Sequence, residues 1–286
     1  MNHIPVLLTE TIELLNPEPG DFIIDGTLGA GGHAREIIKR IKPNGTFLGI
    51  DWDEAAVKNF QQDADIIQGN YADIPNIIQQ KNLPKANGLL LDLGLSSDQF
   101  ESSGRGYSFQ KDEPLDMRYN TEDEDAPTAQ EIISSYPESK LADLIWELGE
   151  ERHARRIAKA IVETRRKEKI TSTKELAEII THAVPGRGRM HPATKTFMAL
   201  RICVNRELEN LKSILGKLPE IIAPEGRVVI ISFHSLEDRI VKQHFRKLEQ
   251  EGRAVRLTKK PIIPSREEIT DNPRSRSAKL RAIEIR

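Results

Sequence analysis

The chain has 286 residues, of which 38% are hydrophobic and 30% are charged, a composition typical of a globular protein with one or two domains. No apolar run approaches the ~20 residues that a bilayer-spanning helix needs, and the first ten residues lack the basic and apolar regions of a signal peptide. We therefore expect a cytoplasmic protein without a membrane span. One cysteine, Cys203, and seven scattered histidines exclude an internal disulfide framework and give no zinc-ligand spacing, so we expect no metal site.

Charge is distributed unevenly along the chain. The formal net charge is −2, but residues 1–149 carry −15, residues 150–215 carry +7 and residues 253–286 carry +6. Two basic stretches are what a nucleic-acid-binding protein needs to neutralise phosphates locally. The alternative, given equal weight on charge alone, is that these residues form solvated helix faces.

Short apolar runs alternate with helical stretches in the first ninety residues. A helix over Leu7 to Leu15 is followed by strands expected at Phe22 to Asp25, Thr46 to Asp51, Ile66 to Gln68 and Gly88 to Leu93. Nearly continuous apolar strands of this kind are buried on both faces of a parallel sheet. Their alternation with helices predicts a doubly wound α/β layer structure.

The pattern changes between residues 114 and 218, where an acidic and polar linker is followed by helical periodicity alone. Strand character returns at Arg227 to Phe233 and then, after a helix, near Val255 to Thr258 and Leu280 to Ile285. A Pro/Ser/Arg-rich loop separates the last two strands. We therefore expect one α/β domain, residues 1–105 and 215–286, interrupted by an all-helical domain, residues 106–214.

Ligands of open α/β sheets bind beyond the carboxyl ends of the strands. The first strand ends at Asp25 and continues into a glycine loop in which Gly31 allows close approach of a ligand. The second ends at Asp51, which can accept both ribose hydroxyls. Because Asp25 would repel a pyrophosphate and attract the cationic S-adenosylmethionine (SAM), we favour SAM over NAD as the ligand. Capping of the loop by Asp25 is the structural alternative.

Two further strand ends carry polar groups. Asp92 ends the fourth strand, where its carboxylate can accept a hydrogen bond from an amine or merely cap the next turn. After the fifth strand, Ser235 and Asp238 have the spacing of a capping box and predict a helix start. His234 lies outside that box, so capping leaves it unexplained.

Seven stretches of the chain closely resemble the bacterial 16S rRNA (cytosine N4)-methyltransferase family, called RsmH or MraW. They are HIPVLLTE from His3, DGTLGAGGHAREI from Asp25, LLLDLGLSSDQF from Leu89, RGYSFQKDEPLDMR from Arg105, EERHARRIAKAIV from Glu150, HPATKTFMALRICVN from His191 and VIISFHSLEDRIVK from Val229. The resemblance implies a Rossmann-like SAM-dependent methyltransferase sheet with an inserted helical domain. It also implies action on a decoding-centre cytidine of 16S rRNA in the small ribosomal subunit. The SAM contacts that it implies fall on Gly31, Gly32, His33, Asp51, Tyr71, Asp92 and Gln99.

The reaction chemistry agrees with an exocyclic amine as the acceptor. Transfer to carbon 5 of cytosine would require a cysteine nucleophile, and Cys203 lies in a helical run with no histidine at base-like spacing. An amine needs acceptors that hold its N–H groups and stabilise the developing positive charge. Asp92 is the first candidate for this role, His234 the second, as acceptor or proton relay, and Asn205 the third. The Asn/Asp-Pro-Pro-aromatic segment of other amine methyltransferases is missing after the fourth strand.

A base that reaches a buried methyl group must leave its stack, so some element must hold the flanking RNA. We expect the helical insertion to do so. Its candidates for stacking and phosphate contacts are Arg105, Tyr107, Phe109, Arg187, Arg189, Lys195 and Arg201. The alternatives are that the aromatic residues seal a domain junction and that the arginines are solvated.

Three other functions fit the residues less well. The basic insertion argues against a SAM-dependent methyltransferase of another substrate class. The joint presence of Asp25, Gly31, Asp51 and Asp92 argues against a non-catalytic RNA-binding assembly module, and Asp25 argues against an NAD enzyme. The sequence leaves open whether the chain is a monomer or a homodimer.

Overall fold

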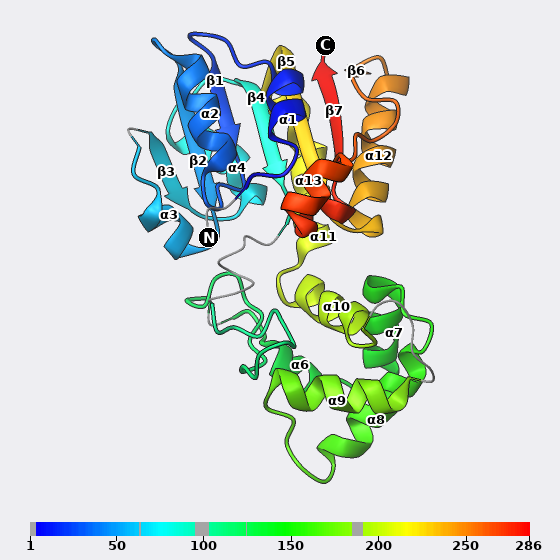
Figure 1. Cartoon of the computed structure of the whole chain (residues 1–286). Coiled ribbons are helices and arrows are strands. Elements are labelled where there is room, and N and C mark those ends of the chain that lie inside the picture. The colour runs from blue at the N-terminus through cyan, green and yellow to red at the C-terminus, as the bar shows by residue number, and fades with distance from the viewer. Residues whose placement is uncertain (1–3, 63, 95–102, 124, 185–190) are drawn as a thin grey trace. The chain divides into compact units, whose positions relative to one another are not determined.

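A computed structural model describes residues 4–62, 64–94, 103–123, 125–184 and 191–286. The chain forms two compact units (Figure 1). The first, called the sheet unit below, comprises residues 1–96 and 208–286, and the second, the helical unit, comprises residues 97–207. No helix in the described ranges is both long enough and apolar enough to span a bilayer.

A seven-stranded sheet forms the centre of the sheet unit. Its strands, in spatial order, are β3 (Asp65–Gln68), β2 (Thr46–Asp51), β1 (Phe22–Asp25), β4 (Ala86–Asp92), β5 (Ile222–Ser232), β7 (Lys279–Ile285) and β6 (Ala254–Arg256). Strands β1 to β5 pair in parallel, and β7 is antiparallel to both of its neighbours. The carboxyl ends of β1 to β5 therefore share one edge, as the predicted doubly wound α/β fold requires, and that prediction is confirmed.

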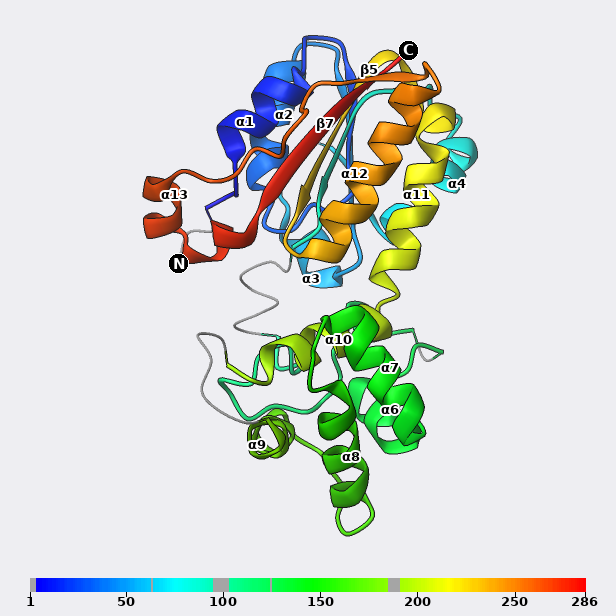
Figure 2. The same ribbon diagram turned by 90° about the vertical axis from the view of Figure 1, so that its right-hand side faces the viewer.

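Helices cover both faces of the sheet (Figure 2). Helices α1 (Leu8–Leu15) and α2 (Gly32–Ile41) lie on one face, and α4 (Ile74–Gln80), α11 (Glu207–Ile221) and α12 (Ser235–Gln250) lie on the other. Successive side chains of a strand point to opposite faces. Leu89 and Leu91 of β4 accordingly pack under α4 and α11, whereas Leu90 packs under α1 and α2. Burial on both faces explains the continuous apolar runs of the sequence.

Four short helical elements follow or precede individual strands of the sheet. Helix α3 (Glu54–Asn59) follows β2, and the 3-10 turn η1 (Tyr71–Asp73) follows β3. The short helix α13 (Arg266–Asp271) and the 3-10 turn η2 (Pro273–Ser277) precede β7.

The periodicity of residues 194–215 is divided between two helices. Helix α10 (Thr194–Val204) ends at Asn205, and Arg206 adopts the left-handed φ of 50° that redirects the chain into α11. Leu211 and Ile214 of α11 lie in the core of the sheet unit. The sequence-based boundary at residue 214 had assigned them to the insertion.

The helical unit consists of α6 (Ala129–Ser135), α7 (Glu138–Gly149), α8 (Ala154–Arg165), α9 (Thr173–Ala183) and α10. Capping boxes begin two of these helices, Thr128 with Glu131 at α6 and Ser172 with Glu175 at α9. Each longer helix buries one apolar side, as the 3.6-residue periodicity predicts. The fully buried side chains include Leu141, Ile145, Ile157, Ile161, Leu176, Ile180 and Leu200.

Candidate functional site

The loop after β1 requires glycine at two positions. Gly29 and Gly31 have φ values of 51° and 73°, which lie in the left-handed region that other residues adopt only at a steric cost. A Cβ atom at Gly31 would lie 2.3 Å from Cε2 of the Phe60 ring. Gly31 is also the N-cap of α2, so the loop places the free N–H groups of that helix at the carboxyl edge of the sheet.

Asp25 ends β1 and is buried beneath this loop, with 2% of its surface exposed. Its Oδ1 accepts hydrogen bonds from the backbone N–H of Thr27 at 3.1 Å and from the Thr27 hydroxyl at 3.4 Å. Burial raises the pKa of Asp25 to about 7, because the Thr27 hydrogen bonds offset only part of the desolvation and the Asp51 charge adds to it. Asp25 therefore caps the loop and also keeps a carboxyl group whose ionised form a nearby cation would stabilise.

Asp51 ends β2 and orders two loops at once. Its Oδ2 accepts the Gly29 N–H at 2.7 Å, and its Oδ1 accepts the Asp53 N–H at 2.8 Å. Burial raises the pKa of Asp51 to about 6 against the opposing effect of these hydrogen bonds. The backbone N–H of Trp52 also acts on Asp51; a carboxylate has about four acceptor positions, so Asp51 keeps capacity for a further donor such as a ribose hydroxyl.

Asp92 ends β4, and of the three carboxylates it receives the fewest hydrogen bonds. Its Oδ1 is buried and has no hydrogen-bond partner among the described residues, and its Oδ2 lies 3.9 Å from Nδ1 of His33. Burial, followed by the charge of Asp25, raises the pKa of Asp92 to about 7. A buried acceptor without a donor is costly, which makes Asp92 the group at this edge most in need of a ligand.

Strand register places the three carboxylates at the same edge of the sheet. Asp25 pairs with Gly49 of β2 and with Leu90 of β4, so Asp51 and Asp92 each lie two residues beyond the pairing position. The charge of Asp51 acts on Asp25, and the charge of Asp25 acts on Asp92. A cation bound here would lower all three pKa values.

The other residues expected to contact SAM fall into three groups. Gly32 and His33 begin α2 under the N-terminal segment, where a Cβ at Gly32 would lie 2.9 Å from Pro5 and His33 Nε2 lies 3.0 Å from the Val6 carbonyl oxygen. Tyr71 begins η1, and its Cβ lies 3.0 Å from the position of a Cβ at Gly26 in the glycine loop. Gln99 lies outside the described residues.

Thr27 connects two of the strand ends and was not singled out in the sequence. Its hydroxyl oxygen accepts the Asp92 N–H at 2.6 Å and donates to Asp25. The connection depends on the pairing of β1 with β4, which are 65 residues apart at this point. A threonine two residues after a strand carries no local signal of such a contact.

His234 has a structural role that the sequence analysis assigned to its neighbours. Helix α12 begins at Ser235 with His234 as its N-cap and Glu237 as the partner in the capping box, so the box predicted for Ser235 and Asp238 is wrong by one residue. His234 Nδ1 accepts the Glu237 N–H at 3.5 Å, and Nε2 lies 3.1 Å from Glu237 Oε1. Nε2 is nonetheless buried without a hydrogen-bond partner among the described residues, so His234 caps the helix and stays a candidate for contact with the amine.

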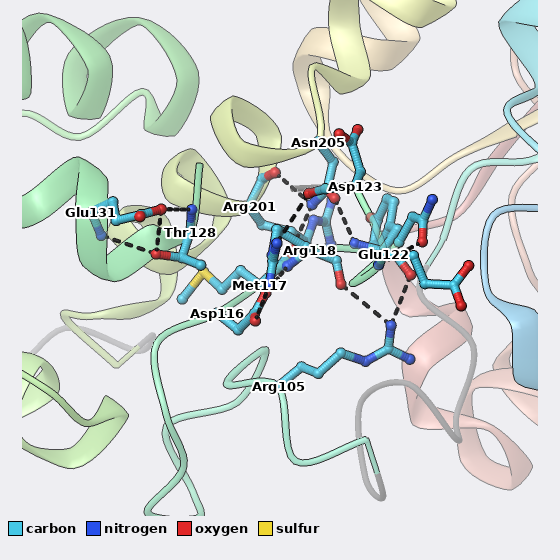
Figure 3. Close-up of polar contacts among 12 residues, drawn as sticks. Arg105, Asp116, Met117, Arg118, Glu122, Asp123, Thr128, Glu131, Arg201 and Asn205 are labelled. Carbon is cyan, nitrogen blue, oxygen red and sulfur yellow. Dashed lines mark hydrogen bonds and ion pairs between the residues drawn. The ribbon is translucent and has the colours of Figure 1, made fainter. Parts of the chain in front are cut away.

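In the helical unit, three of the expected functional residues bind the unit's own backbone and side chains (Figure 3). Asn205 is 5% exposed, accepts the Tyr119 N–H at 2.8 Å and donates to the carbonyl oxygens of Met117 and Arg201. Arg201 forms two hydrogen bonds with Glu207, at 2.8 and 2.9 Å. Arg105 donates to two backbone carbonyl oxygens. The polar groups of Asn205 are thus committed to the fold, which corrects its assignment as a catalytic candidate.

The two aromatic candidates pack inside the helical unit. Tyr107 is 6% exposed and donates its hydroxyl to the carbonyl oxygen of Arg118 at 2.7 Å. Phe109 stacks on His191 at a centroid distance of 4.4 Å and meets Phe197 edge-on at 5.2 Å. The buried Tyr107 ring offers no stacking face to RNA, which corrects that expectation.

The basic candidates of the helical unit differ in their surroundings. Lys195 donates to the carbonyl oxygen of Glu150 at 2.8 Å, and Arg187 and Arg189 lie outside the described residues. The beginning of α8 presents a clearer basic surface. Its exposed members are Arg152, in the turn before the helix, and Arg155, Arg156 and Lys159 in its first two turns.

The fold and the site together define a class of protein. A glycine loop and three carboxylates at the carboxyl edge of a doubly wound sheet are the arrangement expected of a Rossmann-like methyltransferase. The model of the MraW methylase family matches residues 1–286, and the chain belongs to that family. The family membership inferred from the sequence motifs is thereby confirmed.

Curated relatives match the chain over nearly its full length. Ribosomal RNA small subunit methyltransferase H of Coprothermobacter proteolyticus is 45% identical, over 98% of this chain and 95% of its own. The protein of the same name from Deinococcus radiodurans is 46% identical, over 98% of this chain and 88% of its own. The chain is accordingly a methyltransferase of the family to which these proteins belong.

Proposed function

We propose that this protein methylates the exocyclic N4 amine of a cytidine in the decoding centre of 16S rRNA, in the bacterial cytoplasm, with SAM as the methyl donor. The observation that carries the proposal is the unpartnered Oδ1 of Asp92, buried beside two further carboxyl groups at the ends of adjacent parallel strands. The names of the curated relatives support small-subunit rRNA as the substrate.

The residues at the sheet edge fit SAM and do not fit a pyrophosphate. SAM carries an ammonium and a sulfonium group, and each would relieve the electrostatic cost of ionised Asp25 and Asp92. A diphosphate at the same place would face carboxyl groups instead of cations. Asp25, Gly31, Asp51 and Asp92 would hold the bound donor, which supplies an electrophilic methyl group.

Asp92 is the residue best placed to act on the amine. The lone pair of a cytosine amine is delocalised into the ring, and a carboxylate that accepts its N–H makes the nitrogen more nucleophilic. The Oδ1 of Asp92 is free for that bond, whereas the Thr27 hydroxyl and the His33 ring hold the residue in place. The ionised carboxylate can also take up the proton that the positively charged amine loses after methylation.

We assign the positioning of the RNA strand to basic surfaces on both units. In the helical unit the exposed arginines at the start of α8 can contact phosphates without loss of a structural bond. Arg165, farther along the same helix, donates to the carbonyl oxygens of Ile133 and Tyr136 instead. This division between exposed and committed arginines supports a phosphate-binding role for the first two turns of α8.

The test is to map the methyl group. Small ribosomal subunits from a bacterial strain without this modification are incubated with the protein and isotope-labelled SAM, and the digested rRNA is analysed by mass spectrometry. The proposal predicts label on N4 of one cytidine of 16S rRNA. Label on carbon 5, on another base or on ribosomal protein would contradict it.

A further inference from the structure

A cavity of about 300 Å³ lies in the sheet unit at the carboxyl end of β5. It is lined by Phe233 and the two residues that follow it, by residues 276–278 before β7 and by Lys279, the first residue of β7. Figures 1 and 2 show α13 beside this end of β5 and β7. The volume is far above the ~15 Å³ that one water needs and reaches the lower range of ligand pockets, about 300–1,000 Å³.

The charge of this cavity is positive. Arg276 and Lys279 are among its lining residues, and no carboxylate is among those that the structure describes. Arg276 is exposed and has no ion-pair partner among the described residues. Lys279 lies 3.5 Å from Asp238, but that carboxylate also binds Arg281 at the shorter distance of 2.7 Å. An anion is therefore the ligand that the cavity suits.

An apolar surface lies beside the two cations. Ile263 lines the cavity with 64% of its surface exposed, one of three large hydrophobic residues with high exposure among those described. Pro264 and Ile269 extend the apolar side. A phosphate joined to a sugar matches this pairing of charge and apolar surface, whereas a free phosphate would leave the apolar side in water.

The cavity adjoins the end of β4, where Asp92 lies. Asp92 pairs with Ile231 of β5, and the Leu93 N–H donates to the carbonyl oxygen of Ile231 at 3.0 Å. The ring of Phe233 then packs against Gly94, where a Cβ would lie 2.6 Å from the ring Cε2. Phe233 thus forms a wall of the cavity and also contacts the chain two residues after Asp92.

We propose that this cavity binds a nucleotide of the substrate RNA that flanks the methylated cytidine. Its phosphate contacts Arg276 and Lys279, and its sugar lies against Ile263. The inference rests on the proposed rRNA substrate, and it gives a role to Arg276 and Lys279 of the basic stretch at residues 253–286, which the methyl-donor site does not use.

The experiment compares Arg276→Ala with a control at another exposed arginine, Arg253→Ala, whose side chain lies 3.6 Å from Glu251. Arg253 is exposed and follows α12, whose first residue lines the cavity, and the 16 residues of that helix separate the two sites by about 24 Å. Binding of unmethylated small subunits is measured by filter retention over a range of salt concentrations, and SAM binding is measured by calorimetry. We expect Arg276→Ala to raise the Kd for subunits about tenfold and to reduce the slope of log K against log salt by about 0.7, the value for one phosphate of a single strand. The Arg253→Ala control should match the wild-type protein, Arg276→Lys should retain most of the slope, and the SAM Kd should not change.

An unchanged Kd and salt slope in Arg276→Ala, with wild-type methylation intact, would overturn the cavity assignment and leave the proposed function standing. Wild-type protein that leaves the subunits unmethylated would overturn both. Inorganic phosphate is tested as a ligand as well. Phosphate could raise the thermal stability of the wild-type protein but not that of Arg276→Ala, while the two proteins bind small subunits with equal affinity. That result would assign the cavity to a free anion and overturn the RNA proposal.

Discussion

Asp25→Asn should stabilise the protein and at the same time weaken its binding of SAM. Burial raises the pKa of Asp25 from 3.8 to about 7, and a rise of about 3 in pKa corresponds to about 4 kcal/mol. Above pH 7 the folded protein bears this cost of an ionised, buried carboxylate. Asparagine removes the charge and keeps the oxygen that accepts the Thr27 N–H.

The sign of the pH dependence follows from the direction of the pKa change. The folded state binds a proton more tightly than the unfolded state does, so the wild-type protein gains stability as the pH falls from 7 towards 4. The advantage of Asp25→Asn should be about 4 kcal/mol at pH 8, about 2 kcal/mol at pH 5 and about 0.6 kcal/mol at pH 4, and it should vanish only below about pH 3.

Differential scanning calorimetry at pH 8, 6.5 and 5 measures this difference, with the exposed Asp73→Asn as the control. A variant as stable as the wild type at pH 8, or an advantage that does not shrink with falling pH, would refute the reasoning. Calorimetric titration at pH 8 should show a SAM affinity at least tenfold lower for Asp25→Asn, because one of the three counter-charges is lost.

Three further substitutions test the site. Asp92→Ala should lower kcat for methyl transfer by about 100-fold or more without changing the circular dichroism spectrum, and a wild-type kcat would remove Asp92 from the mechanism. Gly31→Ala should lower the free energy of unfolding by about 2 kcal/mol or more, since it combines a left-handed φ with the Phe60 contact. Gly252 also has a left-handed φ, 70°, but has open space around it, so Gly252→Ala measures the backbone cost alone. Equal losses of unfolding free energy in Gly31→Ala and Gly252→Ala would exclude a contribution from Phe60. Thr27→Val should cost about 1–2 kcal/mol by removing the acceptor of the Asp92 N–H, whereas Thr27→Ser should not, and equal unfolding free energies would contradict that role.

The sequence predicts the parallel part of the sheet well because burial on both faces leaves a continuous apolar pattern. The expected strand Thr46 to Asp51 matches β2 residue for residue, and the acidic strand ends follow from the strand boundaries. The place of β7 between β5 and β6 was not predicted. Strand order depends on pairings between distant segments, and the local pattern of Leu280 to Ile285 carries no information on its direction.

In the functional site, too, some residues follow from the local sequence and others depend on contacts with distant parts of the chain. The carboxylates at the strand ends are found from local sequence, because each is the last residue of an apolar run. The structural roles of Asn205 and His234 were not predicted, because their hydrogen-bond partners are set by helix geometry. Asn205 holds the segment at residues 117–119, 86 residues earlier in the chain. His234 replaces the expected Ser235 as N-cap, since the strand continues only to Ser232 and the helix begins three residues later.

Proton release on SAM binding tests the central claim most directly. At pH 7 Asp25 and Asp92, with pKa values of about 7, are each about half protonated, and a bound cation should expel up to about one proton in total. The binding enthalpies measured in phosphate and in Tris differ by the number of protons released multiplied by the difference between the ionisation enthalpies of the two buffers. We expect a release close to one proton at pH 7 for the wild type and none for Asp25→Asn/Asp92→Asn. Identical proton release by the wild type and the double variant would contradict the claim that these carboxylates hold the cationic methyl donor.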